Sequence, residues 1–124
     1  MSATDRQSIG VTARGSDLLE RMTDLGWFPE AQDAARFCLA YAVRAGVPAG
    51  TTDGTSTRWT VSLFDHTGEI RTLLEAVYPD SSTPVRLMEH LVNEGLLLLE
   101  PQLTSGDLSP ADLFVDSPST EPRS

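Results

Sequence analysis

Hydrophobic and polar residues alternate near the start of the chain, and the apolar spacing then becomes helical. Over residues 8–14 apolar residues alternate with polar or small ones, and this period of two predicts a short strand. Gly15 interrupts the alternation, and Ser16 is a suitable N-cap for a helix that Gly26 would end. The apolar stripe of this helix consists of Leu18, Leu19, Met22 and Leu25.

A second helix is predicted from Pro29 to Ala45, because proline suits the first helical position and Gly46 marks an end. Apolar residues lie around most of its circumference. They are Ala31, Ala34, Ala35, Phe37, Cys38, Leu39, Tyr41, Ala42 and Ala45. A helix with so little polar surface is either a core helix or an oligomer interface. Since a chain of 124 residues builds only a modest core, we expect a homo-oligomer.

The second half of the chain predicts a loop, an ambiguous segment and two further helices. Residues 47–57 are rich in Pro, Gly, Thr and Asp, which is typical of an exposed loop. Residues 59–64 contain β-branched and aromatic residues, which fit either a strand or the approach to the next helix. Apolar residues at helical spacing then predict a third helix over 67–79 and a fourth over 83–101, each closed by a proline.

The expected fold class is mainly α, with a flexible N-terminus (1–7), a single helical domain (8–101) and a disordered acidic tail (102–124). The tail is rich in Ser, Pro, Thr, Asp and Gly and has little to bury. One apolar segment, 108–115, interrupts it. Its large apolar side chains include Leu108, Leu113 and Phe114. This segment is either a docking turn for a partner's groove or a turn packed on its own domain.

Composition sets limits on size, location and cysteine chemistry. The 124 residues, of which 40% are hydrophobic, suit one domain. No apolar run approaches the roughly 20 residues that a membrane span needs, and residues 1–10 lack the apolar core of a secretion signal. We therefore expect a cytoplasmic protein without membrane contact. The single cysteine, Cys38, lies among apolar residues and is predicted to be a buried structural thiol.

The formal net charge of -9 lies mostly in the second half of the chain. Residues 1–46 carry five arginines against six acids, whereas residues 47–124 carry four arginines against twelve acids. The sequence contains no lysine, so all nine positive charges are arginines. A sequence-independent grip on a phosphate backbone requires a basic face, and this composition does not supply one.

No motif in the sequence points to catalysis or to a bound metal. His66 and His90 lie on different elements, without a cysteine or a paired carboxylate at metal-ligand spacing. Asp65 is expected to cap a helix, and Glu89 with His90 is expected to be a solvated pair on a charged helical face. Residues 46–54 lack the spaced glycines and the lysine of a P-loop, and the chain has no Gly-x-Ser-x-Gly segment. We therefore expect a non-enzymatic protein without a cofactor.

The first 46 residues present one short strand and two helices joined by a tight connection. This order is similar to that of ribbon-helix-helix proteins, in which two chains pair their strands and interlock their helices. In the DNA-binding members of that fold, the paired strands present polar or basic side chains to the major groove. The corresponding candidate DNA-facing residues of this chain are Arg6, Thr12 and Arg14.

Residues 26–37 read Gly-Trp-Phe-Pro-Glu-Ala-Gln-Asp-Ala-Ala-Arg-Phe, and residues 90–100 read His-Leu-Val-Asn-Glu-Gly-Leu-Leu-Leu-Leu-Glu. The chain resembles small accessory proteins encoded with bacterial DNA-phosphorothioation (Dnd) defence systems, which carry a Phe-Pro-x-x-x-Asp-Ala segment early on and an Asn-x-Gly-Leu-like ending. The resemblance covers residues 9–100 and extends in outline to DndE, a small helical member of the modification machinery. It implies a defence context more strongly than DNA contact, because DndE-type DNA binding rests on lysines.

One function and two alternatives are expected from these observations. The first is a non-enzymatic accessory or adaptor subunit of a bacterial anti-phage or DNA-modification system, acting through protein–protein contacts. The alternatives are a ribbon-helix-helix DNA-binding regulator or antitoxin, and an acidic module that senses phage or mimics DNA. Besides the segment 96–99, the candidate partner or oligomer contacts are Phe28, Phe37, Tyr41, Leu108, Leu113 and Phe114.

Overall fold

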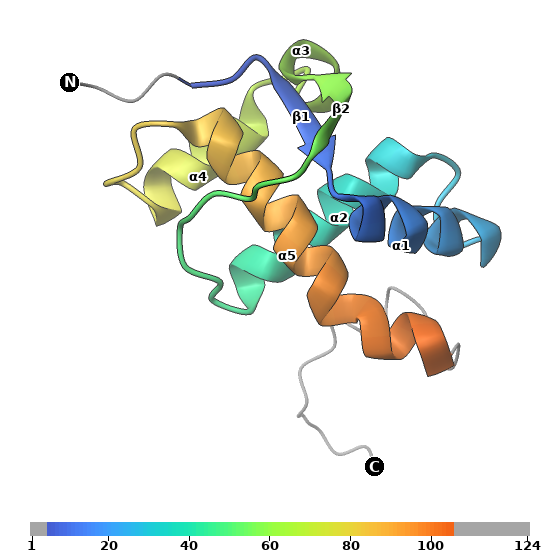
Figure 1. The fold of residues 1–124 in the computed structure, drawn as a ribbon. Coiled ribbons are helices and arrows are strands. Elements are labelled where there is room, and N and C mark those ends of the chain that lie inside the picture. The colour runs from blue at the N-terminus through green and yellow to red at the C-terminus, as the bar shows by residue number, and fades with distance from the viewer. Residues whose placement is uncertain (1–4, 106–124) are drawn as a thin grey trace.

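The longest helix, α5 (Pro84–Ser105), lies in the middle of the molecule, and the other elements pack around it (Figure 1). The structure is a computed structural model that describes residues 5–105 of the chain. The remaining elements are β1 (Ser8–Val11), α1 (Ala13–Asp24), α2 (Ala31–Arg44), β2 (Ser56–Thr60), α3 (Val61–Phe64) and α4 (Glu69–Val77). The architecture is mainly helical with a short N-terminal strand, as predicted. None of the helices within the described range is long and apolar enough to cross a membrane.

β1 pairs with β2 of the same chain in a two-stranded antiparallel sheet. Ser8 lies opposite Thr60 and Ile9 lies opposite Trp59, and the register shifts after Ile9. The strand–helix–helix order of ribbon-helix-helix proteins is present in β1, α1 and α2. The partner of β1, however, is not the equivalent strand of a second chain. A ribbon shared between two copies is therefore not needed to complete this sheet.

The second edge of β1 is hydrogen-bonded to α5 through two buried polar side chains, Glu89 and Asn93. The backbone N–H of Gly10 donates to Glu89 Oε1 (2.9 Å), and the N–H of Thr12 donates to Asn93 Oδ1 (3.0 Å). Asn93 Nδ2 in turn donates to the carbonyl of Gly10 (3.1 Å). Both edges of β1 are thus occupied within one chain, so pairing with a second copy would first have to break buried hydrogen bonds.

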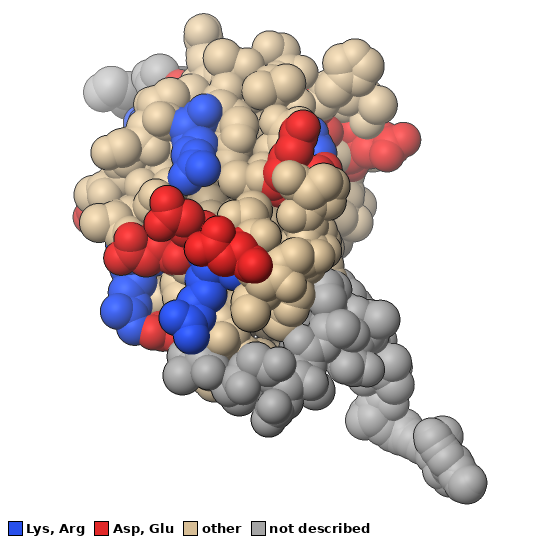
Figure 2. All heavy atoms as spheres, turned by 90° about the vertical axis from the view of Figure 1, so that its right-hand side faces the viewer, with Lys and Arg blue, Asp and Glu red and all other residues tan. Residues whose placement is uncertain are grey.

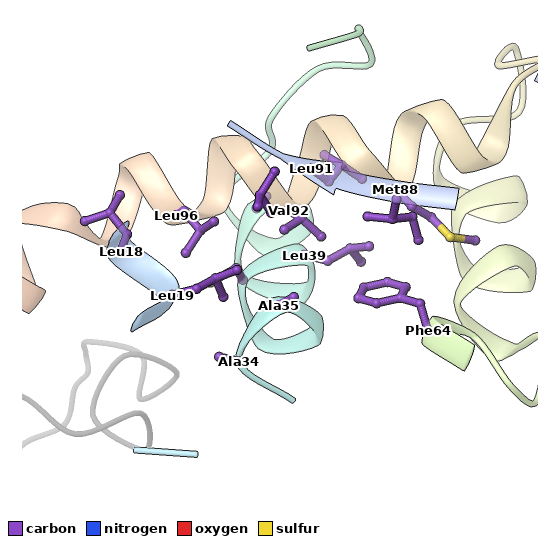
Figure 3. Packing of buried hydrophobic residues seen from close by; sticks show 14 of the residues in the cluster. Leu18, Leu19, Ala34, Ala35, Leu39, Phe64, Met88, Leu91, Val92 and Leu96 are labelled. Atoms are coloured by element: carbon purple, nitrogen blue, oxygen red, sulfur yellow. The ribbon is translucent and has the colours of Figure 1, made fainter. Parts of the chain in front are cut away.

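The hydrophobic core lies where α5 meets the buried faces of α1, α2 and α3 (Figure 3). α2 approaches α5 closely because Gly95 lies at their crossing, where a Cβ would collide with the carbonyl of Cys38. The buried residues of α2 are Ala34, Ala35, Cys38, Leu39 and Ala42. These residues are covered within the chain, whereas Phe37 and Tyr41 are only partly buried. A single chain therefore buries much of the apolar surface on which the sequence bases the prediction of a homo-oligomer.

The N-cap of α1 is Thr12 and not the predicted Ser16. Thr12 has an extended backbone, and its Oγ1 accepts a hydrogen bond from the N–H of Gly15 (2.9 Å). The strand predicted over residues 8–14 is correspondingly shorter, because its last residues belong to α1. The bond from the N–H of Thr12 to Asn93 explains the change, since it fixes the end of the strand at this residue.

Two prolines have different roles from those predicted. α2 begins at Ala31, which is two residues after Pro29. α5 continues through Pro101 to Ser105, although a proline removes one helical hydrogen bond. Packing holds this last turn, because Leu103 is buried and its carbonyl accepts a hydrogen bond from a side chain of α1 (3.3 Å). The predicted end of the fourth helix at Pro101 is therefore too early.

The second half of the chain otherwise follows the predicted order. Residues 47–57 form the expected loop up to the start of β2. The ambiguous segment 59–64 contains both alternatives, because β2 ends at Thr60 and the short helix α3 follows directly. Asp65 then caps α4 as predicted, since its carboxylate accepts hydrogen bonds at 3.0 Å from two N–H groups in the first turn of α4.

The N-terminal segment, predicted to be flexible up to residue 7, is attached to α5 from Asp5 onwards. The Asp5 carboxylate accepts hydrogen bonds from the backbone N–H groups of Val85 and Arg86, both at 3.0 Å. It thereby caps the N-terminal end of α5, where an acidic group is favourable. Residues 1–4 and 106–124, which include the predicted docking turn, lie outside the described residues.

Candidate functional site

A cleft of about 530 Å³ lies where α4 ends and α5 begins. The residues that line it are Ala49, Gly50, Thr51, Val77, Tyr78, Pro79, Asp80, Ser81, Ser82 and Thr83. We call it the Tyr78 cleft. One wall belongs to the loop before β2, and the other belongs to the connection between α4 and α5. Two segments that are far apart in the sequence therefore form the cleft together.

Side chains of the neighbouring elements fix the loop wall of the Tyr78 cleft. The Tyr78 hydroxyl donates to the carbonyl of Val47 (2.6 Å), and Thr52 Oγ1 lies 3.0 Å from His90 Nδ1, within hydrogen-bond distance. Gly50 packs against the His90 ring, where a Cβ would lie 3.0 Å from Nε2. Burial raises the pKa of Tyr78 still further above neutral pH, and the protonated phenol is the donor of this hydrogen bond. The wall is therefore preformed.

α4 exposes part of its own apolar face beside the cleft. Its apolar residues have helical spacing, but Leu74 is the one residue of this helix that is buried. Leu73 is 43% exposed and Val77 is 45% exposed, and Val77 also lines the Tyr78 cleft. We call Leu73 and Val77 the α4 edge. Two apolar side chains one turn apart next to a cleft make the α4 edge a candidate binding surface.

Acidic side chains lie in the cleft and along α4. Asp80 lines the cleft, and Glu69 and Glu75 are exposed on α4, where Glu75 pairs with Arg71 (3.5 Å). Residues 47–105 carry three arginines against eight acids. Asp80 is therefore the acidic group that could pair with a basic ligand in the cleft.

The three candidate DNA-facing residues do not form a common surface on paired strands. Arg6 forms an ion pair with the buried carboxylate of Glu89 (3.3 Å), and Thr12 caps α1. Arg14 belongs to α1 and pairs with Glu100 on α5. On the face shown in Figure 2, arginine side chains lie beside acidic ones and form no continuous basic patch. All three residues thus make contacts that support the fold.

The predicted interface residues Phe28, Phe37 and Tyr41 form a row of partly buried rings. The ring centroids of Phe28 and Phe37 are 5.2 Å apart, and those of Phe37 and Tyr41 are 6.4 Å apart. In the predicted segment 96–99, the first and last leucines are buried and the middle two are exposed. Outside the described residues lie the remaining predicted contacts, Leu108, Leu113 and Phe114.

The residues considered for chemistry have structural surroundings. Cys38 is buried, as predicted, and burial raises the pKa of its thiol. His66 is exposed, whereas His90 contacts the loop wall of the Tyr78 cleft. The prediction of a solvated Glu89 is wrong, because Glu89 is 2% exposed and accepts the hydrogen bonds of β1. Within residues 5–105, no group of three His, Cys, Asp or Glu side chains is placed to hold a metal ion.

Comparison of the chain with protein-family models, curated proteins and solved structures finds no match in any of the three. The site is therefore interpreted from its own geometry. Sequence reasoning missed the Tyr78 cleft, although the hydroxyl-rich run 81–83 was a visible signal. The opposite wall, 49–51, lies some thirty residues earlier in the chain. Only the packing of α4 and α5 brings the two walls together.

Proposed function

We propose that the chain is a non-enzymatic accessory protein that binds a partner protein through the α4 edge and the Tyr78 cleft. The observation that carries this proposal is the incomplete burial of α4, whose residues Leu73 and Val77 are 43% and 45% exposed. Apolar side chains gain free energy when a partner removes them from water. The adjoining cleft of about 530 Å³ lies within the size range of protein binding pockets and could receive a partner's side chain.

The chemistry of the cleft favours a partner segment that carries an apolar side chain next to a basic one. Val77 and Pro79 provide an apolar side of the cleft, whereas Asp80 and the hydroxyl groups of residues 81–83 provide a polar side. An arginine or lysine of the partner could pair with the Asp80 carboxylate. The acidic excess of residues 47–105 would attract such a segment and increase its rate of association.

The resemblance to Dnd accessory proteins supports a component of a DNA-modification defence system as the partner. The ion pairs of Arg6 and Arg14 support a protein partner over DNA, because these arginines are engaged within the fold. The net charge of -9 also supports a protein partner over DNA, since it repels a phosphate backbone. A DNA-binding regulator therefore has less support than an adaptor.

The proposal is tested with random peptides displayed on phage and selected on the immobilised full-length chain. We expect the selected peptides to pair an apolar residue with arginine or lysine, and to lose binding to the double variant Leu73→Asp/Val77→Asp. The matched control is Leu25→Asp, which changes a leucine that is 44% exposed just after α1. Failure to enrich any peptide, or equal binding to both variants, would refute the α4 edge as the binding surface.

A further inference from the structure

The aromatic row on α2 leads to a positive charge at the end of the helix. Phe37, Tyr41 and Arg44 are spaced four and three residues apart, so they lie on one face of α2. Phe28 extends the row at the other end through its ring contact with Phe37. The three rings are partly buried, and Arg44 is exposed. This face therefore combines aromatic surface with one cation.

The segment Leu108–Val115 has chemistry that matches this face. It contains Phe114, which is the one aromatic residue after α5, and Leu113 and Val115 flank this ring. An aspartate lies directly on each side of the Leu-Phe-Val core. A phenyl ring packs favourably on other rings, and the carboxylates would lie close to Arg44. We propose that the aromatic row of α2 holds this segment of the same chain.

The chain is long enough to make this contact. α5 crosses α2 where Gly95 packs against Cys38, the residue that follows Phe37 in the chain. From that crossing to Ser105, α5 advances about 15 Å at a rise of about 1.5 Å per residue. The nine residues from Ser105 to Phe114 reach up to about 30 Å when extended. A chain that leaves the end of α5 can therefore return to α2.

An attached segment competes with any external ligand for the same face. A short connection gives its two ends an effective concentration of the order of millimolar, so a free peptide with the same residues would be at a disadvantage. This inference is independent of the α4 edge, because it concerns different elements of the fold.

A spin label attached beyond the segment tests the proposal in the full-length chain. Ser117→Cys provides the attachment point, because the native Cys38 is buried and does not compete for the reagent. We expect the label to broaden away the amide NMR signals of Phe37 and Tyr41. Adding Phe114→Asp to the labelled chain should restore both signals. The matched control Thr120→Asp adds the same charge outside the segment and should leave the loss unchanged.

The proposal would be overturned if the amide signals of Phe37 and Tyr41 stayed intact in the labelled chain. It would also be overturned if the loss of these signals persisted in the Phe114→Asp variant. A mixture of labelled chain with isotope-enriched, unlabelled chain separates the two molecules: a loss of signal there would place the segment on a second copy and refute the intramolecular contact. Arg44→Glu is expected to restore part of the signals, because it reverses the charge facing the aspartates. The same loss in this variant would overturn the charge match.

Discussion

Replacing Asn93 by alanine would test whether α5 holds the N-terminal strand in place. The Asn93 side chain is 3% exposed, and it accepts a hydrogen bond from the N–H of Thr12 (3.0 Å). It also donates to the carbonyls of Gly10 (3.1 Å) and Glu89 (2.7 Å). Asn93→Ala preserves the helix but removes all three bonds. It leaves the N–H of Thr12 and the carbonyl of Gly10 without the Asn93 side chain as their partner.

The magnitude of the effect is set by these two backbone groups. A buried backbone group left without a partner costs roughly 1–3 kcal/mol, so two such groups cost roughly 2–6 kcal/mol. The higher helix propensity of alanine offsets about 0.5 kcal/mol of this loss. We therefore expect the free energy of unfolding to fall by about 2–5 kcal/mol. The corresponding decrease in Tm is at least about 8 °C for a domain of this size.

Urea denaturation followed by circular dichroism measures this loss, and hydrogen exchange locates it. The matched control is Glu94→Ala, which changes the next residue of α5, a partly exposed side chain. The amide of Thr12 should exchange faster in Asn93→Ala and keep its protection in Glu94→Ala. A loss of less than about 1 kcal/mol, with Thr12 still protected, would show that Asn93 does not hold the strand.

Other contacts give separate expected outcomes. Asp5→Ala should lower the free energy of unfolding by about 1 kcal/mol in urea denaturation, because it removes the cap of α5. Tyr78→Phe should speed hydrogen exchange in the loop 47–52, because Val47 loses its donor. Since burial raises the pKa of Tyr78, the wild type should lose stability as the pH rises past the unfolded-state pKa of tyrosine, and Tyr78→Phe should lose less in denaturation at alkaline pH. Random duplex DNA should give no gel shift at physiological salt, whereas submicromolar binding abolished by Arg14→Ala would favour the DNA-binding regulator.

The features that the sequence predicts correctly are those that local chemistry decides. Gly26 and Gly46 follow α1 and α2, and both have φ of +80°, which is the backbone conformation typical of a residue that ends a helix. The fourth helix, predicted from residue 83, begins at Pro84, whose missing N–H has no helical partner to lose. The carboxylate of Asp65 caps α4 across a few residues of chain. Each of these signals depends on neighbours within about one helical turn.

The predictions fail where contacts between distant residues decide the structure. Glu89 has the sequence surroundings of a solvated acid, but the N–H of Gly10, 79 residues away, donates to it. Pro101 carries a strong stop signal, yet the burial of Leu103 keeps the helix intact. The Tyr78 cleft is a nonlocal feature of the same kind. The aromatic row was partly predictable, because Phe37 and Tyr41 lie one helical turn apart.

Because both edges of β1 are occupied, any homo-oligomer has to use another surface. The outer edge of β2 is the remaining strand edge in the described sheet, but pairing two copies of β2 would bring their exposed Arg58 side chains near each other. The α4 edge exposes Leu73 and Val77, which a second copy could cover, but Glu75 and Asp80 of the two copies would then lie near each other. Light scattering should therefore report a monomer for Leu73→Asp/Val77→Asp wherever the wild type associates. An oligomer that survives this variant would point to β2 instead.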